Sequence, residues 1–140
     1  MPCLAHLGEV ARAFDRLTAA GVSVLAVAQA DPIRLASWVS TTPLPFPLVS
    51  DPDRVAYRTF ALRRVGWGHF FRPGVIGEYL RLMIRGQQLR KPLPGEDVLQ
   101  LGGDFVLDRS RRLIVSRPSR VATDRPTVEE ILTAVRRAKP

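Results

Sequence analysis

The stretch GVSVLAVA, residues 21–28, is a nearly continuous run of apolar and β-branched residues. Such runs are typical of strands that are covered on both faces of a sheet. Before this run, apolar residues recur at helical spacing from Leu4 to Leu17, and Gly21 accepts the left-handed conformation that commonly ends a helix. The sequence therefore predicts a helix over about residues 2–20 that leads directly into a buried strand.

Two aspartate-proline pairs mark the starts of the next helices, which we predict over about residues 31–39 and 51–62. In each pair the aspartate supplies an N-cap and the proline occupies the first turn. The proline-rich residues 42–47 end the first of these helices, and a short strand follows at residues 48–49. This alternation of helix and strand predicts the α/β class, with helices on the faces of an open sheet.

Residues 63–100 form an insertion in this pattern, because glycine, proline and aromatic residues surround one amphipathic stretch at residues 75–84. The interpretation that we favour is a flap packed on the domain. The alternative is a lid or a partner surface that contains Trp67, Phe70 and Phe71.

The remaining residues predict a β-hairpin and a final helix. Apolar residues 105–107 and 113–115 flank the turn segment DRSR, residues 108–111. Thr127 and Glu130 form a capping box at the start of the last helix. Neither an internal repeat nor a linker divides the chain, so we expect residues 1–140 to form a single domain.

The composition excludes several kinds of site. The chain has 140 residues, of which 46% are hydrophobic, enough for one core. One cysteine allows no intrachain disulfide, and two histidines far apart give no metal-ligand spacing, so we expect no metal and no cofactor. Because no apolar run has the length of a bilayer span and charged residues interrupt the first twenty positions, we predict a cytoplasmic protein with no membrane partner.

The net charge of +8 raises the question of a nucleic-acid partner. The arginines are dispersed along the chain, and their local clusters lack interleaved aromatic residues of the kind that stack on bases. We therefore expect a solvated basic surface rather than a nucleic-acid site.

Cys3, the only cysteine, stands where Pro2 and the amphipathic pattern begin the first helix. The free amide hydrogens and the dipole of a helix N-terminus stabilise negative charge, so a thiol in the first turn tends toward the reactive thiolate. Cys3 is therefore the candidate catalytic residue. One turn later, His6 is a candidate to tune the thiol, but the interpretation that we favour is a half-exposed helix histidine.

The order of these elements resembles the thioredoxin-like superfamily and, more closely, the AhpC/TSA-type peroxiredoxin-like proteins. The matching stretches are residues 3–7 (CLAHL), 20–22 (AGV), 45–52 (PFPLVSDP) followed by Tyr57 and Phe60, 101–108 (LGGDFVLD) and 122–126 (ATDRP). The resemblance covers nearly the whole chain and implies a thioredoxin-like three-layer α/β/α sandwich with a mixed sheet. It also implies a peroxide or disulfide substrate and a thioredoxin-like or low-molecular-weight thiol as reductant.

Two features depart from the pattern of these relatives. If Cys3 is the second cysteine of a Cys-x-x-Cys motif, the first falls one residue before Met1. The strand that normally precedes the redox cysteine is also missing, and its loss would leave open edges in the sheet. We expect a truncated start. The alternative is that another chain or a rearrangement fills the edge, and a homodimer is compatible with that alternative.

Within this resemblance, Cys3 is either the resolving thiol of a truncated motif or a lone thiol. A peroxide would oxidise a lone thiol to a sulfenic acid, which an external thiol then resolves. Arg117, Arg120 and Arg125 are candidates to support the thiolate, because a nearby cation favours the charged form. The sequence leaves open whether the chain is an enzyme, and the alternative function is a non-catalytic thioredoxin-like binding module.

Overall fold

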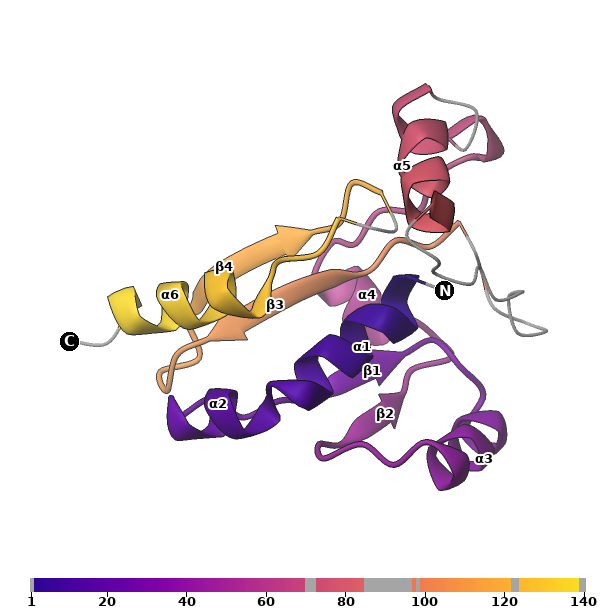
Figure 1. The fold of residues 1–140 in the computed structure, drawn as a ribbon. Helices are drawn as coiled ribbons and strands as arrows, with labels where there is room; N and C mark the ends of the chain where they lie inside the picture. Colours follow the sequence, from indigo (N-terminus) through magenta and orange to yellow (C-terminus); the bar gives the residue numbers. More distant parts are fainter. Residues whose placement is uncertain (1, 70–72, 85–96, 98, 122–123, 139–140) are drawn as a thin grey trace.

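The predicted α/β class is confirmed by a computed structural model, which describes residues 2–69, 73–84, 97, 99–121 and 124–138 (Figure 1). In chain order the elements are α1 (Pro2–Arg12), α2 (Phe14–Ala19), β1 (Ala26–Ala28), α3 (Pro32–Thr41), β2 (Leu48–Ser50), α4 (Val55–Thr59), the short 3-10 helix η1 (Trp67–His69), α5 (Pro73–Ile84), β3 (Gly103–Leu107), β4 (Leu113–Pro118) and α6 (Val128–Ala138).

The described strands form two small sheets. β1 and β2 are parallel, with Val27 opposite Val49, and α3 is the crossover that a parallel pair requires. β3 and β4 are antiparallel, with Phe105 opposite Ser116, and they form the predicted hairpin. The described strands thus combine parallel and antiparallel pairing, and no ladder joins one pair to the other.

The first helix and the first strand differ from the prediction. The helix is interrupted at Ala13, whose φ and ψ of −98° and 7° depart from α-helical values. Gly21 ends it as predicted, at φ 80°, and the Val22 N–H then donates to the Leu17 carbonyl at 2.9 Å. The strand spans Ala26–Ala28 rather than 22–28, because its parallel ladder with β2 contains only three residue pairs.

Side-chain caps begin α3 and α6 where the sequence predicts them, whereas α4 begins later than predicted, with Arg54 in a left-handed conformation at its N-cap position instead of Asp51. Asp31 and Asp51 each accept two backbone N–H groups, at the starts of α3 and α4. At α6 the Thr127 hydroxyl accepts the Glu130 N–H, while the Glu130 carboxylate accepts the Thr127 N–H. α4 is shorter than predicted, since Ala61 adopts a left-handed φ of 51° that an α-helix does not continue through.

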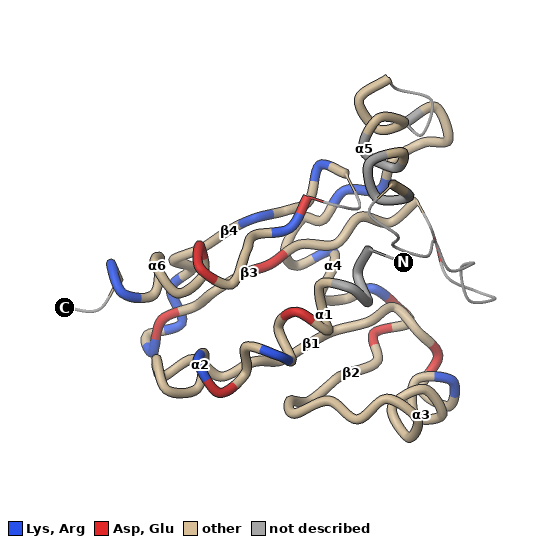
Figure 2. Tube along the Cα trace, viewed as in Figure 1, with Lys and Arg blue, Asp and Glu red and all other residues tan. Residues whose placement is uncertain are grey.

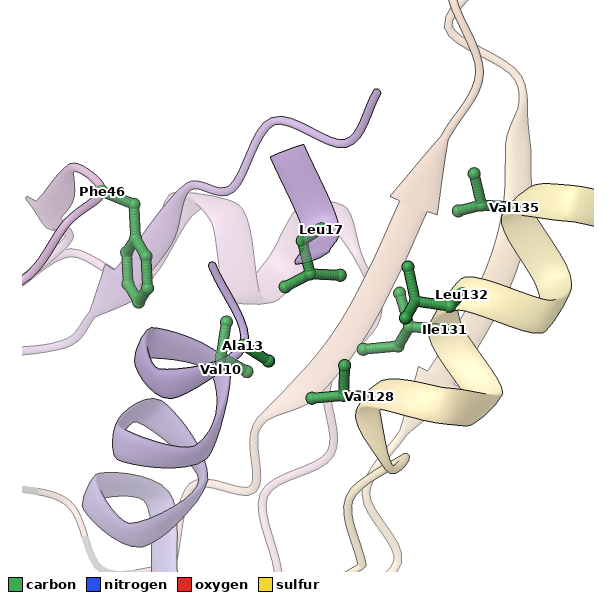
Figure 3. Packing of buried hydrophobic residues seen from close by; sticks show 8 residues of the cluster. All are labelled: Val10, Ala13, Leu17, Phe46, Val128, Ile131, Leu132 and Val135. Atoms are coloured by element: carbon green, nitrogen blue, oxygen red, sulfur yellow. The ribbon is translucent and has the colours of Figure 1, made fainter. Parts of the chain in front are cut away.

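The main buried core lies between α1, α2 and α6, which are in front of the strands in the view of Figure 1. Figure 3 shows its members, Val10, Ala13, Leu17, Phe46, Val128, Ile131, Leu132 and Val135. The four residues of α6 follow the i, i+3, i+4, i+7 spacing of an amphipathic helix. Burial of this stripe against α1 and α2 fixes the N-terminal helix relative to the end of the chain.

The opposite side of the strands carries more exposed apolar surface. Val27 and Val49 are register partners, so they share a face, and both are exposed together with Leu25. On the other sheet, Phe60 stacks on Phe105 with ring centroids 4.3 Å apart. Burial in the described residues is therefore concentrated on the side of α1, α2 and α6.

The predicted amphipathic stretch at 75–84 is helical, as α5, which stands apart from the two sheets (Figure 1). Trp67 lies in η1, whereas Phe70 and Phe71 of the predicted lid or partner surface lie outside the described residues. None of the described helices combines the length and hydropathy needed to cross a bilayer.

Candidate functional site

Cys3 is the second residue of α1, in the first turn, as the sequence predicts. The first turn contains no acidic residue, so no carboxylate competes there for the free amide hydrogens of the helix. The Cys3 side chain itself lies outside the described part of the structure. The described contacts nearest to this helix end are those of His6 and Glu9, which follow Cys3 along α1.

His6, one turn after Cys3, joins a charged network with two residues from distant parts of the chain. Its Nε2 lies 2.9 Å from one carboxylate oxygen of Asp104, and Arg125 Nη1 donates to the other at 2.9 Å. The three side chains are only 12%, 20% and 14% exposed, respectively. Glu9, on the next turn of α1, lies 4.0 Å from the His6 Nδ1. The network thus connects α1, β3 and the segment before α6.

Two local features bring Arg125 to this place. Gly102 is required for the approach, because a Cβ at that position would collide with the Arg125 guanidinium. The turn before Arg125 is closed by Ser119, whose N–H donates to the Gly102 carbonyl and whose hydroxyl donates to the Asp124 carbonyl, both at 2.9 Å. Gly102, just before β3, therefore makes room for an arginine that the turn between Ser119 and Arg125 presents.

Asp104 is the centre of the network and is ionised at neutral pH. Burial disfavours its carboxylate, but the hydrogen bond from His6 and the charge and hydrogen bond of Arg125 together outweigh burial and lower the pKa of Asp104 below its usual value. A buried carboxylate that is stabilised in this way balances the positive charge of Arg125. The pair places a carboxylate against His6 of α1 and the guanidinium that balances it on the other carboxylate oxygen.

The three arginines that the sequence suggested as candidates to support the Cys3 thiolate have different environments in the structure. Arg125 reaches the network beside α1, whereas Arg117 is exposed and lies 3.9 Å from Glu130 on α6. Arg120 is exposed and its backbone N–H donates to Asp124. Among these three, only Arg125 is joined to the helix that carries Cys3.

Two interpretations from the sequence are corrected here. His6 is not a half-exposed helix residue, because its side chain is largely buried against Asp104. Asp104 was not identified as a site residue, although it follows two glycines at the start of an apolar strand. Its partners, however, are 98 residues before it and 21 residues after it, beyond the reach of local patterns.

A second charged cluster ties the end of the insertion to the parallel sheet. Asp97 accepts hydrogen bonds from Arg54 and Arg64, each at 2.7 Å, and its backbone carbonyl accepts from Gln29 just after β1. The hydrogen bond from Arg64 is the main reason that the pKa of Asp97 is lowered. With both arginines more than one-third exposed, this cluster is an anchor at the surface.

The His6–Asp104–Arg125 network is separate from the cavity that the described residues line and from any metal site among them. A cavity of about 300 Å³ lies between β4 and α6, and none of the three network residues lines it. The described residues include no group of three or more metal-ligating side chains. The arginines of the described residues are spread over several elements rather than gathered in one stripe (Figure 2).

Comparison with known families gives one match. Residues 9–117 match the family described as AhpC/TSA antioxidant enzyme. The matched region includes Gly102 and Asp104, begins after Cys3 and His6, and ends before Arg125. Searches of curated proteins and of solved structures gave no match.

Proposed function

Because the chain belongs to the AhpC/TSA antioxidant enzyme family, we propose that it is a thiol-dependent redox protein of the peroxiredoxin type that reduces peroxides through Cys3. Membership in this family also implies a thioredoxin-like fold, for which we propose a three-layer α/β/α sandwich with a mixed sheet. The observation that carries the functional proposal is the position of Cys3, in the first turn of α1 and one turn from the buried network around His6.

Two physical effects favour the thiolate at this position. The N-terminus of α1 offers unpaired amide hydrogens and a partial positive charge, with no acid in the first turn. Arg125 contributes by balancing the charge of the Asp104 carboxylate, which contacts His6 and would otherwise disfavour a second negative charge nearby. In an α-helix, residues three positions apart are neighbours, so Cys3 and His6 share one region of the helix surface.

The chemistry follows from a thiolate in such a site. The Cys3 sulfur attacks one peroxide oxygen, the S–O bond forms while the O–O bond breaks, and the departing oxygen takes up a proton and leaves as water or an alcohol. The sulfur is oxidised by two electrons to a sulfenic acid. An external thiol then condenses with the sulfenic acid, releasing water and forming a mixed disulfide, and a second thiol reduces that disulfide and regenerates Cys3.

Intact-mass measurement after stoichiometric peroxide and a sulfenic-acid trap tests the proposal. Because Cys3 is the only cysteine, a trapped adduct locates the reaction without peptide mapping. We expect one adduct at neutral pH, absent in a Cys3→Ser control. A folded protein that forms no adduct would reject the proposal and favour the non-catalytic binding module.

A second measurement asks whether Arg125 supports the thiolate. The rate of alkylation of Cys3 by iodoacetamide at neutral pH reports its thiolate fraction. We expect Arg125→Gln to lower this rate by about threefold or more, because loss of a nearby cation raises a thiol pKa. Arg117→Gln is the matched control, since Arg117 is an exposed arginine of the same region that contacts α6 instead. Equal rates in the two folded variants would assign no such role to Arg125.

A further inference from the structure

Two basic segments that are separate in the sequence lie at one end of the fold. Arg117, near the end of β4, lies 3.9 Å from Glu130 in the first turn of α6, and residues of both elements line one cavity. β4 and α6 therefore lie side by side and run in opposite directions (Figure 1). As a consequence, the hairpin turn that precedes β4 and the last turn of α6 are at the same end of the molecule.

These two segments gather five arginines, although the described arginines as a whole are spread over several elements. The hairpin turn is residues 108–112, DRSRR, and the last turn of α6 contains Arg136 and Arg137. Together they have one acid, Asp108, and all five arginines are exposed. We call residues 108–112 with Arg136 and Arg137 the arginine end. In Figure 2 the blue parts of the hairpin turn and of the end of α6 lie on the same side of the fold.

Asp108 holds the hairpin turn in one shape. Its carboxylate accepts hydrogen bonds from the Ser110 hydroxyl at 2.6 Å and from the Arg112 N–H at 2.9 Å. These bonds lower the pKa of Asp108 to about 2, so the carboxylate is ionised at neutral pH. Arg112 Nε also donates to this carboxylate at 3.1 Å, yet the Arg112 side chain remains 82% exposed. The backbone that carries the three arginines of the turn is therefore ordered before any partner binds, which lowers the cost of binding.

Three guanidinium groups of the arginine end have no anionic partner within the described part of the chain. Arg109, Arg111 and Arg137 form neither an ion pair nor a side-chain hydrogen bond with the described residues. Guanidinium groups bind phosphate oxygens through two parallel N–H donors, and such bonds are among the stronger ones in proteins. The arginine end therefore offers unused donors that fit phosphate groups.

The residue types at this end select among polyanions. Docking on a membrane also needs apolar side chains that enter the acyl boundary, and the hairpin turn contains none. Single-stranded nucleic acid is held by aromatic rings that stack on bases, and neither segment has one. A second copy of the chain would bring like charges together. The backbone of a duplex needs only cations at its phosphates, and its major groove admits a two-stranded β-ribbon.

We propose that the arginine end binds the phosphate backbone of duplex nucleic acid without sequence preference. Contacts to phosphates position a protein on the duplex but carry no sequence information. This contact revises the expectation of a solvated basic surface, which rested on the dispersion of the arginines along the sequence. It is independent of the proposed redox chemistry, because the hairpin turn is at the opposite end of β3 from Asp104.

Fluorescence anisotropy of a labelled DNA duplex, titrated with the full chain at several salt concentrations, tests the proposal. Each phosphate contact releases condensed counterions, so the logarithm of the association constant falls linearly with the logarithm of the salt concentration. We expect a slope of about −4.5 if all five arginines contact phosphates. A folded protein that binds no duplex at low salt would overturn the proposal.

Arg109→Gln/Arg137→Gln and Arg63→Gln/Arg120→Gln form a matched pair for locating the contact. Each double variant removes two positive charges at exposed positions. Arg63 and Arg120 are controls because backbone hydrogen bonds hold their segments beside residues 101–102, at the other end of the hairpin. We expect Arg109→Gln/Arg137→Gln to weaken duplex binding by about tenfold or more and to reduce the salt slope by about two, whereas the control pair keeps the slope.

Other results of these measurements would reject the assignment. Equal changes of the salt slope in both double variants would mean that net charge alone drives the binding. Phosphatidylserine vesicles that displace the duplex would assign the arginine end to a membrane surface. Polyglutamate that displaces the duplex at equal charge concentration would assign it to an acidic protein partner.

Discussion

The His6 imidazole and the Asp104 carboxylate are separated by 98 residues in sequence and meet at 2.9 Å in the folded chain. Their contact joins α1 to β3, and Arg125 extends it to the segment before α6. When one partner of a buried hydrogen bond between charged or polar groups is removed, the group that remains is still desolvated but has lost its bond. Removal of a single partner is therefore costly. The stability of the N-terminal helix α1 is therefore linked to β3 and to the segment before α6.

Asp104→Asn removes the central charge of this network. We expect a loss of about 2 to 3 kcal/mol in the free energy of unfolding, below the range for fully buried pairs because Asp104 remains 20% exposed. Urea denaturation measures it. Asp53→Asn, at an exposed aspartate just before α4, is the control and should change the free energy by less than about 0.5 kcal/mol. Similar losses in both variants would show that the network adds no stability of its own.

Gly102→Ala places a methyl group where the Arg125 guanidinium lies. We expect destabilisation of about 1 to 3 kcal/mol from the overlap. The double variant Gly102→Ala/Arg125→Ala should lose less than the sum of the two single variants, because truncating the arginine also removes the collision. A double-mutant cycle in urea measures this coupling. Strict additivity would contradict the close approach of the two residues.

The dependence of stability on pH should also report Asp104. Its pKa in the folded chain is lower than the ordinary 3.8, so the unfolded chain binds the proton more readily. The contribution of Asp104 is therefore fully present above pH 3.8 and is lost as pH falls through the lower folded pKa. Urea denaturation from pH 5 downward, an interval chosen to bracket that window, should show a shallower decline in Asp104→Asn than in the parent chain. Parallel curves would exclude a stabilised carboxylate at this position.

Thr127→Ala removes the cap of α6, the helix that contributes four residues to the core. We expect a loss of about 1 kcal/mol, because the Glu130 N–H loses its side-chain acceptor. Thr133→Ala, at an exposed position inside the same helix, is the matched control and should be neutral or slightly stabilising, since alanine favours helix. Thermal unfolding of the pair separates the cap from the general effect of removing a threonine.

Local signals in the sequence determined where most elements begin and end. Asp31 and Thr127 cap helices at the predicted positions, and Gly21 follows the end of α2 as predicted, whereas Asp51 lies four residues before the start of α4. These signals act over about four residues, through hydrogen bonds to nearby backbone groups, so they can be identified without knowing the tertiary structure. The resemblance to the AhpC/TSA proteins also depended on the sequence alone, and the family match confirms it.

Tertiary packing decided the features that no local pattern contains. The length of the strand at Ala26–Ala28 depends on the three residues with which β2 pairs. Burial of α1 and α2 against α6 brings His6, Asp104 and Arg125 together from separate parts of the chain. The sequence alone placed Cys3 at a helix start, because capping and spacing are local. Which cation lies near that helix was fixed only when distant segments packed, because charges far apart in sequence interact strongly only where folding removes the water between them.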